Sequence, residues 1–227
     1  MYAFGSLVGG DFNIQTSDFD LLAITVNDVS SELLEKLKST HTDFIKHNSA
    51  WDNRVEVAYM SRHAMKTFKE KPSRIVRISP GEPLHTVEAS IHWLMDWYMV
   101  QNQGEIIFGP NPSELIPNIT QKEFIHEVKV HMGFWREWVE GAKTEGYQAY
   151  IVLLMCRNMY AVKYGRQTSK DKGAAWVLKE FPEWAQFIET VVKWRRVKSQ
   201  EVNQEGHAKT KEFVEFALNQ VDSSNTK

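Results

Sequence analysis

The sequence predicts an α/β (α+β) domain with a small mixed sheet, followed by an all-α helical bundle. Two observations carry this prediction. In the first half, short runs rich in Val, Ile and Leu alternate with helical patterns of apolar residues. In the second half, successive helical patterns are separated by Gly and Pro. We therefore expect one domain over residues 1–108 and a second over residues 109–227.

Three strands and two helices are expected before the helical half begins. Ser30 precedes the first helix, and Ser61 precedes the second in the position of an N-cap. Pro80 and Gly81 end the third strand. In chain order, the expected elements are a strand at 18–26, a helix at 30–48, a strand at 54–60, a helix at 61–68 and a strand at 74–78.

The remaining elements are all expected to be helical. Trp93, Leu94 and Trp97 recur at helical spacing, and a proline-rich linker follows at 108–117. Gly165 is placed to close the most apolar of these helices. The expected helices cover 87–100, 120–141, 146–164, 169–180, 183–199 and 210–221, and the tail at 223–227 is expected to be frayed.

Length, charge and cysteine content narrow the class of protein. A chain of 227 residues can bury a sizeable core. The formal net charge of -2 gives no bulk attraction to nucleic acid, and no apolar run reaches the length of a membrane span. The single cysteine, Cys156, lies in an apolar run and is expected to be a buried thiol. Because no secretory segment opens the sequence, we expect a cytoplasmic protein without nucleic-acid or membrane partners.

The first 22 residues contain the most informative motif. Gly5 and Ser6 form a small turn, and Asp18 and Asp20 follow at the start of an apolar run. Side chains two residues apart in a strand point to the same face, so the two carboxylates should converge. Such a pair favours a hard divalent cation such as Mg2+, and a glycine turn allows close approach to a phosphate. The motif suggests phosphoryl or nucleotidyl transfer, although Asp-x-Asp also occurs in turns that bind no metal.

Glu56 is a candidate third carboxylate for the same site. It stands between two valines in the expected strand at 54–60. Such a residue ordinarily faces solvent, but beside two aspartates it is a candidate general base. The order of these motifs resembles the DNA polymerase beta-like nucleotidyltransferases, in which two aspartates hold the metal ions and a later strand supplies the third carboxylate.

The second half carries a more specific resemblance. Residues 154–160, Gly165 and residues 169–176 resemble the helical C-terminal domain of aminoglycoside 3''-adenylyltransferases, the streptomycin and spectinomycin modifying enzymes. The resemblance implies that Arg157 and Lys170 contact the phosphates of ATP, which suits a planar guanidinium and a mobile ammonium. From the residues alone, each is more simply a structural helix residue.

The resemblance also implies a complete reaction in a cleft between the two domains. ATP with two Mg2+ ions would lie over Asp18 and Asp20. Glu56 would accept the proton of an acceptor hydroxyl while AMP is transferred to it. The residues implied to hold the β and γ phosphates are Gly5, Ser6 and Ser17.

The acceptor is less closely defined. Streptomycin-modifying members have acidic and Trp residues at the start of the helix that carries the arginine, and these hold the cationic drug. At that place this chain has Lys143 and a single acid, Glu145. We therefore expect Glu145, Asp96 and Trp93 to be the candidates for contacting the acceptor.

Two alternatives stay open at this point. The acceptor can be a protein hydroxyl, as in a toxin-antitoxin pair, instead of streptomycin or spectinomycin. The protein can also bind a nucleotide without catalysis. Members that resemble this chain usually have a helix and a longer strand before the Gly-Ser turn, where this sequence has residues 1–4.

Overall fold

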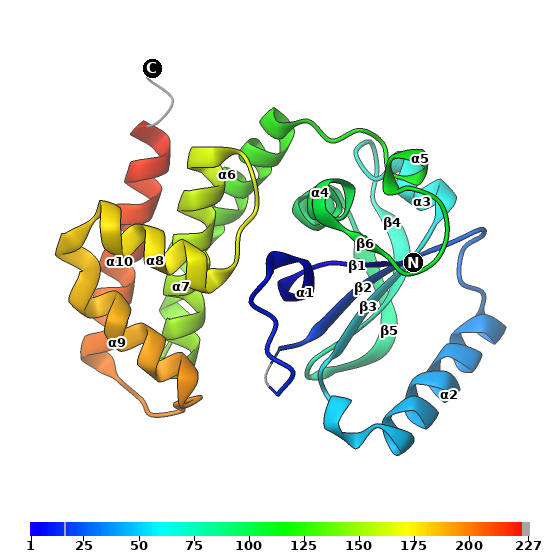
Figure 1. Cartoon of the computed structure of the whole chain (residues 1–227), viewed down its shortest axis with the longest axis horizontal. Coiled ribbons are helices and arrows are strands. Elements are labelled where there is room, and N and C mark those ends of the chain that lie inside the picture. Colours follow the sequence, from blue (N-terminus) through cyan, green and yellow to red (C-terminus); the bar gives the residue numbers. More distant parts are fainter. Residues whose placement is uncertain (16, 224–227) are drawn as a thin grey trace. The chain divides into compact units, whose positions relative to one another are not determined.

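The computed structural model describes residues 1–15 and 17–223, and the chain divides into two compact units. Unit 1 covers Met1–Thr120 and unit 2 covers Gln121–Lys227. The first contains a mixed sheet with helices and the second contains helices (Figure 1). The expected combination of a small mixed sheet and a helical bundle is therefore confirmed.

Unit 1 is built on a six-stranded sheet with the order β5-β4-β3-β2-β1-β6. Only β2 and β3 pair in parallel, and the other neighbours are antiparallel. The strands are β1 (Tyr2–Ala3), β2 (Phe19–Thr25), β3 (Val55–Ser61), β4 (Ser73–Ser79), β5 (Glu82–Ala89) and β6 (Glu105–Ile106). The strands expected at 18–26, 54–60 and 74–78 are thus present.

The helices of unit 1 begin where the sequence offers caps. The side chain of Ser30 accepts a hydrogen bond from the backbone N–H of Leu33, and Ser61 accepts one from Ala64. The helices are α1 (Ser6–Gly9), α2 (Ser31–His47), α3 (Arg62–Thr67), α4 (Leu94–Gln103) and α5 (Pro112–Leu115), with 3-10 turns at Ser49–Trp51 and Ile91–Trp93.

The contact between His41 and Tyr59 connects α2 to the sheet. Nε2 of His41 lies 2.8 Å from the hydroxyl of Tyr59. Burial raises the pKa of Tyr59 to about 12 and lowers the pKa of His41. Both groups are therefore held in their neutral forms at neutral pH.

The prediction of a helix at 87–100 is wrong for its first residues. Residues up to Ala89 form β5, which pairs with β4 in a hairpin turned by Gly81 at φ 83. The helix α4 starts only at Leu94. Pairing with a neighbouring strand supplies hydrogen bonds that a local sequence pattern does not predict. These bonds favour a strand here, although the apolar residues have helical spacing.

Unit 1 extends past the boundary expected after residue 108. The side-chain amide of Gln101 donates to the carbonyl of Ile119 at 3.1 Å and accepts from its N–H at 2.9 Å. The hydroxyl of Tyr2 donates to the carbonyl of Pro110 at 2.8 Å. These bonds hold the expected linker against the sheet domain, and part of it forms α5.

Unit 2 is organised around α7 (Glu145–Tyr164), which contacts each of the other long helices of the unit. Gly165 ends it in the left-handed conformation at φ 63, as expected for a C-cap glycine. Cys156 is buried on this helix, and burial raises the pKa of its thiol. The other helices are α6 (Gln121–Trp138), α8 (Lys170–Glu180), α9 (Ala185–Arg196) and α10 (Gln204–Ser223), with 3-10 turns at Val139–Gly141 and Pro182–Trp184.

Two helices of unit 2 differ from their expected ranges. The helix expected from 183 begins as a 3-10 turn, so α9 starts at Ala185. The helix expected from 210 begins at Gln204, where the side chain of Asn203 accepts a hydrogen bond from the N–H of Gly206 at 2.7 Å. Of the tail expected to be frayed, residues 224–227 lie outside the described residues.

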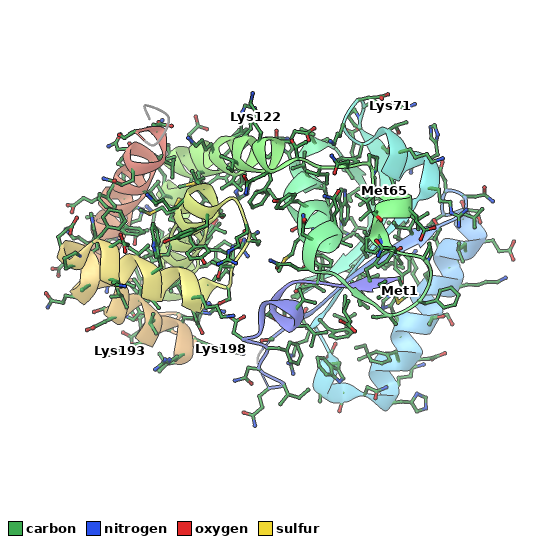
Figure 2. The ribbon with its side chains drawn as sticks, turned by 45° about the horizontal axis from the view of Figure 1, so that its top comes forward. Met1, Met65, Lys71, Lys122, Lys193 and Lys198 are labelled. Atoms are coloured by element: carbon green, nitrogen blue, oxygen red, sulfur yellow. The ribbon has the colours of Figure 1, made fainter. Side chains whose placement is uncertain are left out.

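Charged and apolar side chains separate as expected for a folded protein in water. Met65 of α3 is fully buried in unit 1, whereas Lys122 of α6 and Lys193 of α9 are exposed on unit 2 (Figure 2). No helix within the described residues is both long enough and apolar enough to cross a membrane.

Close contact between α7 and α8 should depend on Gly173. A Cβ atom there would lie 2.7 Å from the Cα of Arg157 and 2.8 Å from its backbone nitrogen. We expect Gly173→Ala to lower the free energy of unfolding by about 1–3 kcal/mol, as overpacking does. Urea denaturation measures this change. The control is Gly133→Ala in α6, which has open space around it and should gain about 0.5–1 kcal/mol.

Candidate functional site

The turn at Gly5 lies directly against Asp20. Gly5 has φ 69, and a Cβ atom built on it would overlap the Oδ2 atom of the Asp20 side chain. The backbone N–H of Phe4 donates to the carbonyl of Asp20 at 3.0 Å, which fixes the end of β1 beside β2. Glycine is therefore required for two reasons, its left-handed backbone and its missing side chain. Ser6 follows as the first residue of the short helix α1.

The loop before β2 is held by Arg54. Its Nε and Nη2 atoms donate to the carbonyl of Ser17 at 3.2 and 2.6 Å, and Nη2 also donates to the carbonyl of Ile14 at 2.8 Å. The hydroxyl of Ser17 accepts a hydrogen bond from the N–H of Asn13 at 2.9 Å. Sequence reasoning missed Arg54 in this role, since the backbone carbonyls that it binds have no sequence signature.

Two carboxylates, Asp20 and Glu56, lie on one face at the start of the two parallel strands. The register pairs Asp20 of β2 with Glu56 of β3, and paired residues of neighbouring strands project to the same face. Asp18 precedes Asp20 by two residues, just before the strand begins. This face also carries Leu22, which is fully buried and pairs with Ala58. An apolar row thus lies beside the acidic one.

The donor set of this acidic face suits a hard cation. Asp18 and Asp20 offer only oxygen atoms, which Mg2+ prefers. Within residues 1–15 and 17–223, no group of three or more His, Cys, Asp or Glu side chains is arranged to hold a metal ion. The oxygen atoms of an aspartate pair have the donor chemistry that suits a magnesium ion.

Glu56 has a cationic partner that the sequence reading missed. Its Oε1 lies 3.0 Å from Nη2 of Arg77 in β4, and both side chains are about a quarter exposed, at 28%. Arg77 pairs with Ala58 across the sheet, so it projects to the same face as Glu56. A strand prediction that included pairing with residues 54–60 would have placed Arg77 here; the local pattern by itself did not.

The two acceptor candidates in unit 1 lie on and before α4. Trp93 stacks on Trp97 with ring centroids 5.4 Å apart, and the guanidinium of Arg77 lies 5.4 Å from the centroid of the Trp93 ring. Asp96 is half-buried in the first turn of α4. Trp93 is therefore connected to the acidic face through Arg77.

Glu145 has a structural role in unit 2. Its Oε2 accepts a hydrogen bond from the hydroxyl of Ser199 at 2.6 Å, and its Oε1 accepts one from the amide of Asn203 at 2.9 Å. Its backbone N–H donates to the carbonyl of Glu201 at 2.9 Å. The carboxylate therefore ties the start of α7 to the segment before α10.

Arg157 and Lys170 lie on the adjacent helices α7 and α8. Gly173 of α8 packs against the backbone of Arg157, which brings the start of α8 close to the middle of α7. The ammonium of Lys170 lies 4.3 Å from the centroid of the Tyr150 ring. Ser169 caps α8 by accepting from the N–H of Lys172. Two cations are thus placed on neighbouring elements of one unit.

The contact between Gly5 and Asp20 should be visible in stability. Gly5→Ala combines strain at a positive φ with displacement of the Asp20 carboxylate, whereas Gly81→Ala has the same kind of strain in open space. We expect each change to cost about 1–3 kcal/mol, with Gly5→Ala the larger of the two. Thermal unfolding of both variants gives the difference, and equal losses would contradict the contact.

Replacing Glu145 should affect stability first. Glu145→Ala removes two hydrogen bonds to a charged group and should lower the free energy of unfolding by about 1–3 kcal/mol. Glu137→Ala on α6, where the residue is exposed, is the matched control. Urea denaturation measures both variants. An unchanged free energy of unfolding in Glu145→Ala would indicate that this carboxylate does not stabilise the fold and is available to bind a ligand.

Comparisons with known proteins agree with the sequence reading. Residues 114–220 match the model of the aminoglycoside adenylyltransferase C-terminal domain. A search of curated proteins gave no match. Among solved structures, the fold is similar to that of spectinomycin adenyltransferase AAD(9) from Enterococcus faecialis with ATP and spectinomycin, with a TM-score of 0.68 and 14% identity. That match covers 97% of this chain and 90% of the other.

The family model and the solved structure cover different parts of the chain. At 14% identity, the structural match establishes the fold over nearly the whole length. The family model matches residues 114–220, which include most of the helices of unit 2. Residues 114–220 are therefore similar to the C-terminal domain of aminoglycoside adenylyltransferases, and the whole chain has a fold similar to that of spectinomycin adenyltransferase AAD(9).

Proposed function

We propose that the protein transfers AMP from ATP to a hydroxyl group of an aminoglycoside or aminocyclitol such as spectinomycin or streptomycin. The observation that carries the proposal is the parallel pairing of Asp20 with Glu56 beside the turn at Gly5. The name of the structurally similar enzyme supports the acceptor class, since that protein is a spectinomycin adenyltransferase with ATP and spectinomycin bound.

Metal and phosphate binding are proposed for separate groups of residues. Asp18 and Asp20 would hold two Mg2+ ions, which neutralise charge on the phosphate oxygens when bound. Arg157 and Lys170 would contribute positive charge to the phosphates. The turn residues proposed to donate hydrogen bonds to the β and γ phosphates are Gly5, Ser6 and Ser17.

Glu56 is the proposed general base. In the described part of the chain, Oε1 of Glu56 is bound to Arg77, while Oε2 has no hydrogen bond or ion pair. Oε2 would accept the proton from the acceptor hydroxyl. The hydroxyl oxygen then forms a bond to the α-phosphorus, the bond from that phosphorus to the bridging oxygen breaks, and pyrophosphate leaves with the bonding electrons.

The candidates for binding the acceptor are Glu145, Asp96 and Trp93. Glu145 already accepts two hydrogen bonds, so holding a cationic drug would require it to give up those partners. Asp96 and Trp93 are the remaining candidates from the sequence. The weak net charge of -2 supports a small-molecule acceptor over nucleic acid, and we propose that the enzyme acts in the cytoplasm.

Pyrophosphate release from Mg-ATP is the test of this function. We expect release with spectinomycin or streptomycin, each assayed separately, and no release without a drug. Asp20→Asn and Glu56→Gln should each reduce turnover by at least about 100-fold, because each removes a group proposed to act on the reacting atoms.

The controls distinguish the loss of a catalytic group from loss of the fold and from the wrong choice of acceptor. Glu137→Gln, an exposed change on α6, should keep full turnover. Full turnover in Asp20→Asn would contradict the metal role. A protein that binds ATP but releases no pyrophosphate with either drug would contradict the proposed acceptors while leaving the fold assignment intact.

A further inference from the structure

Arg77 combines several interactions on the acidic face of unit 1. Its Nη2 lies 3.0 Å from Oε1 of Glu56, and its Nη1 lies 3.7 Å from Oε2 of Glu82 in β5. The guanidinium plane also lies over the ring of Trp93, with 5.4 Å between the Cζ atom and the centroid. Three separate elements therefore hold one arginine side chain.

The burial of Arg77 shows why these partners matter. Within the described residues, its Nε atom is buried and has no hydrogen-bond partner. An orphaned donor carries a desolvation cost, so the observed position must be held by the two carboxylates and the ring. Glu82 is itself fixed, because its Oε2 accepts a hydrogen bond from the hydroxyl of Ser79 at 3.1 Å.

The arrangement leaves one oxygen of Glu56 for chemistry. A guanidinium is planar and binds carboxylates in a fixed direction, unlike an ammonium. With Oε1 engaged by Arg77, the rotation of the Glu56 carboxylate is restricted and Oε2 is turned away from that bond. A general base has to lie within hydrogen-bond reach of its proton, so restricting this rotation has a direct effect on the reaction.

We propose that Arg77 is a positioning residue that orients the carboxylate of Glu56 for proton abstraction, supported by Glu82 and Trp93. The inference rests on the proposed role of Glu56 as the base. Arg77 does not touch the reacting atoms; it acts through Glu56. Its removal should therefore lower kcat, with little change in the KM for ATP.

The chain offers a matched control on the same strand. Arg74 lies three residues before Arg77 in β4, so it projects to the opposite face of the sheet. It is exposed and has no ion pair among the residues that the structure describes. Arg74→Met removes the same charge from the same strand without touching Glu56.

Turnover is the first measurement, with Mg-ATP and spectinomycin or streptomycin as probes. We expect Arg77→Met to lower kcat by about 10- to 100-fold, the range typical of residues that orient a reacting group. Arg77→Lys, which keeps the charge but loses the planar fork, should recover part of the loss. Arg74→Met should keep the kcat of the unchanged protein. In a Glu56→Gln background, Arg77→Met should add no further loss, because residues that act as a unit are non-additive.

A second measurement is independent of catalysis. In protein labelled with carbon-13 at the glutamate carboxyl, the signal of Glu56 is assigned by its disappearance in Glu56→Gln. That signal should shift in Arg77→Met and stay in place in Arg74→Met. An unchanged Glu56 signal in Arg77→Met would overturn the ion pair, whatever the activity of the variant.

The outcomes distinguish the two proposals. Full turnover in Glu56→Gln would reject Glu56 as the base and the positioning role with it. Loss of turnover in Glu56→Gln with full kcat in Arg77→Met would reject only the positioning role. If the losses of kcat in Glu56→Gln and Arg77→Met add in the double variant, Arg77 acts independently of Glu56. That result would also reject the positioning role.

Discussion

The parallel pairing of β2 with β3 is the constraint on which the site depends. It sets Asp20 beside Glu56, although the two residues are far apart in the sequence. A shift of one residue in this register would send one of the carboxylates to the other face of the sheet. The antiparallel pairing of β1 with β2 is the second constraint, because it places the turn at Gly5 against the Asp20 side chain.

The register is held by apolar burial on the same face. Tyr2, Leu22 and Ala58 form a row of paired residues across three strands, and all three are buried. Removing such side chains from water favours the one alignment in which they meet. The neighbouring acidic row is costly without a cation. The apolar row thus provides stability that allows like charges to remain close together.

Glu145 in unit 2 has hydrogen-bond partners that the sequence did not indicate. From the resemblance, Glu145 was expected to contact the acceptor, and both of its oxygens accept hydrogen bonds from the segment before α10. A carboxylate that closes a structural network is weakly available to a ligand, since binding would leave its former donors without partners. The cap at Ser169 is local to the start of α8, whereas the close contact of Gly173 with the backbone of Arg157 is made between α8 and α7.

The sequence by itself determined the features that rest on local chemistry. These include the strand that follows Asp18, the caps at Ser30 and Ser61, the end of α7 at Gly165 and the similarity of residues 114–220 to a known C-terminal domain. Only the tertiary structure decided that residues 82–89 form a strand, that Arg77 binds Glu56 and that Glu145 binds Ser199. The physical reason is that each of these depends on a partner brought close by folding, and side-chain periodicity carries no information about partners distant in the sequence.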